Sequence, residues 1–412
     1  MKQFPPQFLW GASTSAHQVE GNNHNDWSEW ELRTATQKAY RASLHTFPEY
    51  ITKRYPDPRS KENYISGIAA DHYHRFKEDI DLLQSLNLNA YRFSIEWSRI
   101  EPQEGEWNEE ALLHYEEVLR ELAAQKIEPF VTLWHWPLPI WLRDKGGWEC
   151  SKTPEYFSRY AAYIATRLGS HIRFWITLNE PEVYASKSYL LGVWPPQKRN
   201  YFAYAHVMKN LVRGHRAAYH CIKAVDPHAQ IGIAKQNAYF EAHKKTLVNR
   251  LLCALVRWYG NEKLLNSIDT TQDFIGLNHY FHYCIHQGAI CNNKAKKSDL
   301  GWELYPEGIY HVLKDLELYR KPIYITENGL ADAEDMYRAW FIKETLYHIH
   351  RAIQEKVDVR GYFHWSLLDN FEWAEGFWPR FGLVEIDYHT LTRIPRPSCI
   401  IYATIAHNNA LD

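Results

Sequence analysis

The segment Ile323-Tyr324-Ile325-Thr326-Glu327-Asn328-Gly329 gives the clearest indication of the fold. Its first four residues favour β-structure and are mostly apolar, and they lead into one carboxylate and an Asn-Gly turn. A short apolar run of this kind is typical of a strand buried in a parallel sheet. A charged side chain at the C-terminal end of such a strand has no packing role, but in an eight-stranded α/β barrel that end carries the chemistry.

A second segment follows the same pattern. Phe174-Trp-Ile-Thr-Leu-Asn179-Glu180-Pro181 is again an apolar run that ends in a carboxylate. Two strands that each end in glutamate predict paired carboxylates facing one pocket, which is the arrangement that glycoside hydrolysis requires.

Six further segments have the composition of buried strands, namely residues 8–14, 88–95, 127–134, 230–234, 273–280 and 359–368. Regularly spaced strands with helical segments between them indicate parallel crossover units. Eight such units close into a barrel, and no Gly/Ser-rich linker divides them. The sequence therefore predicts an α/β protein with one domain, a (β/α)8 TIM barrel over residues 1–412, whose active site lies at the C-terminal ends of the strands.

Several connecting segments have helical signals. Residues 71–87 place apolar side chains at helical spacing, Asn108 is positioned as a helix cap, and Thr153-Pro154 is typical of a helix start. Residues 31–65 show no clear period, and we expect a long loop with short helical pieces there.

Composition narrows the function classes. The formal net charge of −2 gives no basic field for nucleic acid or anionic lipid. The six cysteines have no CxxC and no metal-type spacing with histidine, so we expect neither a metal nor a cofactor. The N-terminus lacks the apolar run of a signal peptide, and no stretch reaches the ~18–20 apolar residues of a membrane span, so we expect a cytoplasmic protein. The sequence leaves the oligomeric state open.

The ends of the predicted strands and the loop after the last one collect a particular set of side chains. Two carboxylates, several hydrogen-bonding groups and a tryptophan would meet at the strand ends: Gln18, Arg92, His135, Asn179, Glu180, Asn278, Tyr280, Glu327 and Trp365. The loop just beyond the last strand adds Glu372 and Trp373. Sugars present hydroxyl groups at their edges and apolar C–H patches on their faces, so such a pocket suits a small β-glycoside or oligosaccharide.

The sequence also resembles glycoside hydrolase family 1, the retaining β-glycosidases. The matching pieces run in family order, from Phe8-Leu-Trp-Gly-Ala-Ser-Thr-Ser-Ala-His-Gln-Val-Glu-Gly through Thr177-Leu-Asn-Glu-Pro, Ile325-Thr-Glu-Asn-Gly and Gly361-Tyr-Phe-His-Trp-Ser-Leu-Leu-Asp-Asn-Phe-Glu-Trp. Each piece alone is moderately specific, whereas the ordered set is very specific.

The resemblance implies an exo-acting β-glucosidase, with β-galactosidase and β-fucosidase activity also expected. Glu180 would be the general acid/base and Glu327 the nucleophile, with Arg92, Asn278 and Tyr280 supporting the nucleophile. The remaining implied positions bind substrate: Gln18, His135, Asn179, Glu372 and Trp373 bind the glycon, Trp365 lies under the sugar ring, and Trp302 lines the aglycone side.

The sequence departs from the family in three respects. Histidine stands at His17 and His279, where the family often has tyrosine, and the stretch between Glu180 and Glu327 is shorter than usual. Two alternatives stay open. A 6-phospho-β-glycosidase is disfavoured because Glu372 would repel phosphate. A catalytically silent sugar-binding barrel is disfavoured because both glutamates are present.

Overall fold

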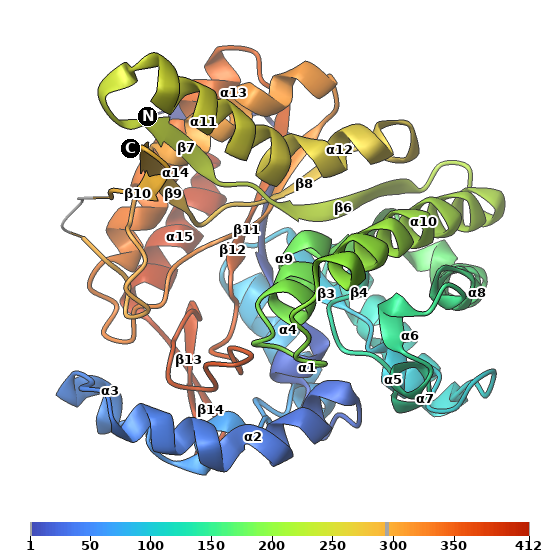
Figure 1. Cartoon of the computed structure of the whole chain (residues 1–412). Coiled ribbons are helices and arrows are strands. Elements are labelled where there is room, and N and C mark those ends of the chain that lie inside the picture. Colours follow the sequence, from blue (N-terminus) through green and yellow to red (C-terminus); the bar gives the residue numbers. More distant parts are fainter. Residues whose placement is uncertain (1, 293–295, 412) are drawn as a thin grey trace.

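The computed structural model describes residues 2–292 and 296–411 and contains a closed, fully parallel barrel (Figure 1). All eight expected strands are present, and neighbouring strands pair in the order β11-β12-β2-β3-β4-β5-β6-β8. Their bounds are Leu9–Ser13 (β2), Ala90–Ser94 (β3), Glu128–Trp134 (β4), Phe174–Asn179 (β5), Gln230–Gln236 (β6), Ile275–Asn278 (β8), Ile323–Asn328 (β11) and Val359–Trp365 (β12). The predicted (β/α)8 barrel is confirmed.

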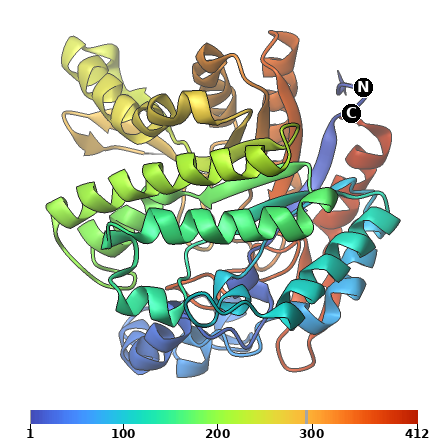
Figure 2. The ribbon, with the colours of Figure 1, turned by 90° about the vertical axis from the view of Figure 1, so that its right-hand side faces the viewer.

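Helices surround this barrel (Figures 1 and 2). The longer ones are α2 (Asp26–Ser43), α4 (His72–Ser85), α6 (Glu109–Ala124), α8 (Thr153–Leu168), α10 (Tyr201–Val225), α11 (Leu247–Arg257), α13 (Gly308–Leu316), α14 (Arg338–Gln354) and α15 (Pro397–Asn408). Shorter helices lie in the loops: α1 (Ala16–Val19), α3 (Glu49–Thr52), α5 (Trp97–Ile100), α7 (Ile140–Asp144), α9 (Pro181–Ala185) and α12 (Lys263–Ile268).

Aromatic rings fill the inside of the barrel. Phe130 of β4 stacks on Phe174 of β5 with ring centroids 4.2 Å apart, and Phe363 of β12 lies 4.8 Å from Phe130. Phe274, directly before β8, and Tyr324 of β11 belong to the same buried layer. Because side chains occupy the interior at this level, the barrel is a packed core, and any cavity must lie beyond it toward the strand ends.

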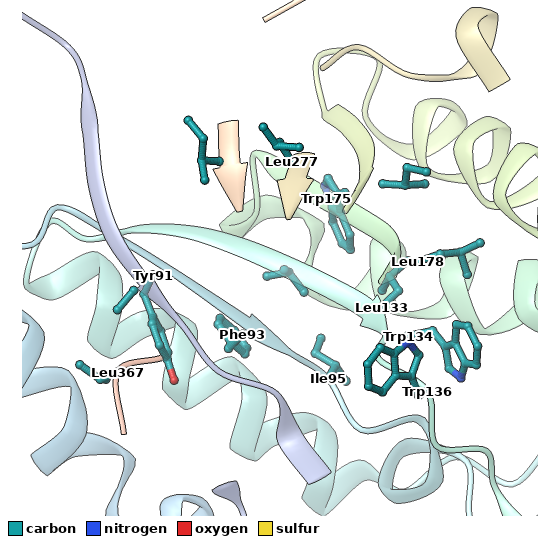
Figure 3. Close-up of a cluster of buried hydrophobic side chains, with 14 of the residues drawn as sticks. Tyr91, Phe93, Ile95, Leu133, Trp134, Trp136, Trp175, Leu178, Leu277 and Leu367 are labelled. Atoms are coloured by element: carbon teal, nitrogen blue, oxygen red, sulfur yellow. The ribbon is translucent and has the colours of Figure 1, made fainter. Parts of the chain in front are cut away.

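The outward-facing side chains of the strands pack against the helices. Figure 3 shows part of this core, in which Tyr91, Phe93, Leu133 and Trp175 are all buried. Helices α8 and α10 lie side by side (Figure 2). Gly214 of α10 permits close packing against α8 and the turn before it, because an added Cβ would lie 3.4 Å from the ring of Phe157 and 2.9 Å from that of Trp148.

The expectation of a long loop over residues 31–65 is wrong in its first part, because α2 is an 18-residue helix. Asn25 and Ser28 form a reciprocal capping box at its N-terminus. Its buried face carries two tryptophans and three alanines, namely Trp27, Trp30, Ala35, Ala39 and Ala42. Small alanines between polar residues give a weak apolar period, which explains why the pattern was missed.

The other expected helices are confirmed. Helix α4 covers the predicted segment, Asn108 caps α6 by accepting a hydrogen bond from Ala111 N at 3.2 Å, and α8 begins at Thr153. Gly169 follows α8 in a right-handed conformation and starts a short 3₁₀ turn.

Three small sheets complete the architecture. Strands β1 (Lys2–Gln3) and β15 (Ala410–Leu411) pair, so the two ends of the chain lie together. Strands β13 (Val384–Asp387) and β14 (Thr392–Pro395) form a hairpin. Strands β7 (Tyr239–Ala242), β9 (His282–His286) and β10 (Ala289–Ile290) form a third sheet in the order β10-β9-β7. Among the helices of the described residues, none is both long and apolar enough to cross a bilayer.

Candidate active site

A cavity of about 740 Å³ opens at the C-terminal ends of the barrel strands. This volume lies within the ~300–1,000 Å³ typical of small-molecule sites. Eight of the residues expected at the site line it, namely His135, Glu180, Tyr280, Trp302, Glu327, Trp365, Glu372 and Trp373. The other four, Gln18, Arg92, Asn179 and Asn278, are buried and hydrogen bond to residues of this lining.

Glu327, near the end of β11, is held by two donors. Its Oε1 forms an ion pair with Nη1 of Arg92, whose side chain is fully buried. Its Oε2 accepts a hydrogen bond from Tyr280 Oη at 2.8 Å. A cation and a phenol aimed at one carboxyl group favour its ionised form.

Glu180 has different surroundings. It follows β5 with a left-handed φ of 41°, so the chain turns sharply into α9, whose first residue is Pro181. Its Oε1 accepts a hydrogen bond from Asn278 Nδ2 at 2.8 Å, and no ion pair to it is found among the described residues. A non-glycine residue held at positive φ is costly, and such residues cluster at functional sites.

The two carboxyl groups adjoin the same amide. Asn278 hydrogen bonds to Glu180, and its side chain also stabilises the charged form of Glu327. The backbone of Glu327 also pairs with that of Asn278 in the β11–β8 ladder, so both carboxyl groups lie at the same point of the barrel rim. Adjacent carboxyl groups fit direct displacement at a sugar carbon, for which a retaining pair lies ~5–5.5 Å apart.

The electrostatics of the pair are unequal. Burial, followed by the negative charge of Glu327, raises the pKa of Glu180 to about 8. Burial also raises the pKa of Glu327, but Arg92 and Tyr280 oppose this effect. Near neutral pH the arrangement therefore favours a protonated Glu180 beside an ionised Glu327.

A second layer of polar groups orients this pair. Arg92 donates from Nη2 to Asn179 Oδ1 at 2.6 Å and from Nε to Thr132 Oγ1 at 3.1 Å. Asn179 Nδ2 lies 2.9 Å from His135 Nε2. The other ring nitrogen of His135, Nδ1, is buried and has no hydrogen-bond partner among the described residues. Burial and the Arg92 charge lower the pKa of His135, so the ring is neutral.

The loop after β12 carries two of the glycon candidates, Glu372 and Trp373, and Gln18 of α1 contacts this loop. Gln18 donates from Nε2 to Glu372 Oε2 at 3.4 Å, and burial raises the pKa of Glu372 to about 8. Trp373 stacks on His17 with centroids 5.6 Å apart, and Trp365 stacks on His135 at 6.0 Å. His17, the first departure from the family, therefore packs against Trp373 of the cavity and does not itself line the cavity.

His279, the second departure from the family, and three further buried or half-buried glutamates occupy different positions relative to the cavity. His279 is buried, with Nδ1 2.9 Å from Asn237 O, and it does not line the cavity. Glu20 binds Arg99, and Glu96 accepts a hydrogen bond from Ser98 Oγ at 2.6 Å; neither residue lines the cavity. Glu182 differs, because its side chain lines the cavity.

Sequence reasoning missed part of the outer wall. Lys235 of β6 forms a 2.7 Å ion pair with Glu182, and both line the cavity together with Trp136 and Trp194. The sequence offered one indication of this wall: Lys235 directly follows the apolar run of a predicted strand, so its side chain could have been expected at the same rim. Trp302 also lines the cavity, with its ring centroid 4.7 Å from that of Phe281 and 5.9 Å from that of Tyr280.

Comparison with known proteins gives consistent results. The model of the family described as glycosyl hydrolase family 1 matches residues 1–258 and 239–411. Beta-glucosidase A of Thermotoga maritima is 34% identical, covering 100% of this chain and 99% of its own length. A beta-galactosidase of Saccharolobus solfataricus is 30% identical, covering 100% of this chain and 96% of its own.

Solved structures are similar over the whole chain. The beta-glucosidase from Thermotoga maritima in complex with glucoimidazole has a TM-score of 0.88 at 32% identity, covering 100% of both chains. A beta-glycosidase from Pyrococcus horikoshii has a TM-score of 0.86 at 34% identity, covering 100% of this chain and 96% of its own.

Proposed function

Because the chain belongs to glycosyl hydrolase family 1 and is a glycoside hydrolase, we propose that it is a retaining exo-β-glycosidase that acts by double displacement. Glu180 is the general acid/base and Glu327 is the nucleophile. The single observation that carries these assignments is that two buried carboxyl groups adjoin one amide while only Glu327 is paired with a cation. We also propose that residues 1–412 form one glycosidase domain.

In the first step, Glu327 attacks the anomeric carbon while Glu180 protonates the leaving oxygen. Arg92 and Tyr280 keep Glu327 ionised, which supports its role as nucleophile. The raised pKa of about 8 supports Glu180 as the acid, because the proton is in place near neutral pH.

In the second step, water replaces the leaving group and Glu180 becomes the base. Esterification of Glu327 removes the negative charge that raises the pKa of Glu180. The pKa of Glu180 then falls, so the same group accepts a proton from the attacking water. A sugar acceptor in the place of water would give transglycosylation by the same route.

The substrate is proposed to be a terminal β-linked sugar of a small glycoside or oligosaccharide. Gln18, His135, Asn179 and Glu372 would bind the glycon hydroxyls, and Trp365 and Trp373 offer apolar faces for the ring. Relatives named as a beta-glucosidase and a beta-galactosidase support both gluco and galacto glycons, with fuco as a further expectation.

Both alternatives have less support. Glu372 and Glu375 line the same cavity, and two carboxyl groups there disfavour a 6-phospho glycon. A silent sugar-binding barrel would not need the Arg92 ion pair to Glu327, which is present.

The test is hydrolysis of a panel of aryl β-glycosides, including a 6-phosphoglucoside. The purified protein is compared with Glu327→Gln and with Glu344→Gln, which changes an exposed glutamate of α14. We expect β-glucoside hydrolysis with the β-anomer formed first, loss of activity in Glu327→Gln and full activity in Glu344→Gln. Release of the α-anomer first, or equal activity in all three proteins, would overturn the proposal.

A further inference from the structure

Two thiols and one imidazole converge outside the catalytic cavity. The sulfur atoms of Cys284 and Cys291 lie 3.2 Å apart, and His243 Nδ1 lies 3.8 Å from the sulfur of Cys284. All three ligand atoms lie within 4.8 Å of one another. Among the described residues this is the one group of histidine, cysteine and acidic side chains with the geometry of a metal site.

Backbone pairing in the β10-β9-β7 sheet fixes these positions. Cys291 directly follows β10, and its N–H donates to Cys284 O at 2.8 Å, which extends the hairpin by one residue. Strand β7 runs parallel to β9 with Ala242 opposite Ile285, so His243 follows at the same end of the sheet. Three residues from separate parts of the chain are therefore held on a pre-formed frame.

Asn249 of helix α11 hydrogen bonds to two segments of this sheet. Asn249 donates from Nδ2 to the carbonyl of His243 and accepts from Gln287 N at 2.9 Å. One side chain thus ties the segment that carries His243 to the turn between β9 and β10. A metal binds more tightly to ligands that do not have to be ordered first.

We propose that His243, Cys284 and Cys291 form a zinc site. A tetrahedral zinc ion with Zn–S distances of about 2.3 Å and a Zn–N distance of about 2.0 Å places its sulfurs about 3.8 Å apart and each sulfur about 3.5 Å from nitrogen. The distances of 3.2 and 3.8 Å lie close to these values. The fourth position is left for water.

The ligand set favours zinc over other common ions. Soft thiolates with an imidazole select zinc and disfavour magnesium and calcium, which take oxygen ligands. Each thiol releases its proton on binding, so two thiolates balance the charge of one zinc ion. The two cysteines and His243 are only half-buried, so an ion from solution can reach them.

The site adjoins the outer wall of the catalytic cavity. Tyr283 precedes Cys284, Asn292 follows Cys291, and both line the cavity. Asn292 also accepts from Cys284 N at 2.8 Å and donates to Glu303 Oε2 at 2.8 Å. A metal that links these segments stiffens the part of the cavity wall that Tyr283 and Asn292 form; Trp302, which the resemblance to family 1 places on the aglycone side, lines the same cavity.

The direct test is a titration of the reduced, chelator-treated full chain with Co²⁺, followed by competition with Zn²⁺. We expect one equivalent of cobalt to produce thiolate-to-metal absorption and tetrahedral visible bands, which zinc then removes. Cys284→Ser and Cys291→Ser should each weaken zinc binding by at least about 100-fold, beyond the ~10–100-fold typical of losing a partner of a ligand.

The control is Cys221→Ser, which removes a thiol whose sulfur instead contacts Ser158 Oγ at 3.0 Å. It should bind cobalt as the unaltered chain does, and thermal unfolding of the metal-free variants checks that each one folds. Absence of cobalt absorption, or absorption retained in both ligand variants, overturns the site. So does a reduced protein that binds no metal and oxidises to a Cys284–Cys291 disulfide.

A kinetic readout separates this inference from the proposed function. Removing the metal should raise KM for disaccharides but leave kcat for activated aryl glycosides unchanged, because the wall and not the carboxyl pair is altered. Metal binding itself needs no turnover, so the titration stands even if the proposed glycosidase activity fails.

Discussion

The charge of Glu327 sets the acidity of Glu180, and Glu327→Gln tests this link directly. Burial is the largest cause of the raised pKa of Glu180, and the Glu327 charge is the next. Glutamine keeps the shape of the side chain but removes the charge, as esterification does during turnover. We therefore expect the pKa of Glu180 to fall from about 8 in this variant.

The size of the fall follows from the geometry. The retaining mechanism proposed for this chain places its two carboxyl groups ~5–5.5 Å apart. At an effective dielectric constant of about 20, two charges at this distance repel by about 3 kcal/mol. This energy corresponds to about 2 pKa units. Burial persists in the variant, so the new pKa should be about 6, still above that of a solvated glutamate.

The assay is ¹³C NMR titration of protein labelled at the glutamate carboxyl carbons, with the Glu180 signal assigned by its loss in Glu180→Gln. Glu182→Gln is the matched control, because the Glu182 charge is the smallest of the contributions to the pKa of Glu180 and is paired with Lys235. We expect a clearly smaller shift in this control. An unchanged Glu180 pKa in Glu327→Gln, or an equal shift in both variants, would refute the electrostatic coupling.

Three further outcomes are expected. Glu180→Ala should lower kcat/KM by ~10²–10⁴-fold for alkyl glucosides but far less for dinitrophenyl glucosides, because only poor leaving groups need protonation; equal losses would contradict the acid role. Tyr280→Phe removes a donor to Glu327 and should lower kcat/KM by ~10–100-fold, with the acidic limb of the pH–rate profile moved to higher pH; an unmoved limb would exclude this role. Asp369→Ala removes the buried partner of Arg396, which keeps the longer 3.4 Å ion pair to Glu385, and should cost about 3–5 kcal/mol in denaturant unfolding. Burial opposes ionisation of Asp369 but Arg396 and Arg380 lower its pKa, so its contribution to stability is present at neutral pH and is lost as pH falls through the folded pKa.

The barrel and most of the site could be predicted from the sequence because each strand can be recognised from its own residues. Ile323–Asn328 and Phe174–Asn179 are apolar runs with polar residues at one end, and a parallel barrel brings those ends to one rim. No long-range information is needed to place Glu180 and Glu327 on the same face.

Features that depend on three-dimensional proximity could not be predicted in the same way. Cys284 and Cys291 lie seven residues apart and have no motif spacing, and only the hairpin register places their sulfurs together. His243 joins them through the parallel pairing of β7 with β9. The ion pair of Lys235 with Glu182 likewise joins the end of β6 to α9, which follows β5.

The most direct test of the account is to trap the covalent intermediate with dinitrophenyl 2-deoxy-2-fluoro-β-glucoside. Fluorine at C2 slows both displacement steps, while the good leaving group keeps the first one fast enough for the glycosyl-enzyme to accumulate. Mass spectrometry of the digested protein should find one fluoroglucosyl group, on the peptide that contains Glu327. A label on any other residue, or an active enzyme that never becomes labelled, would contradict the assignment.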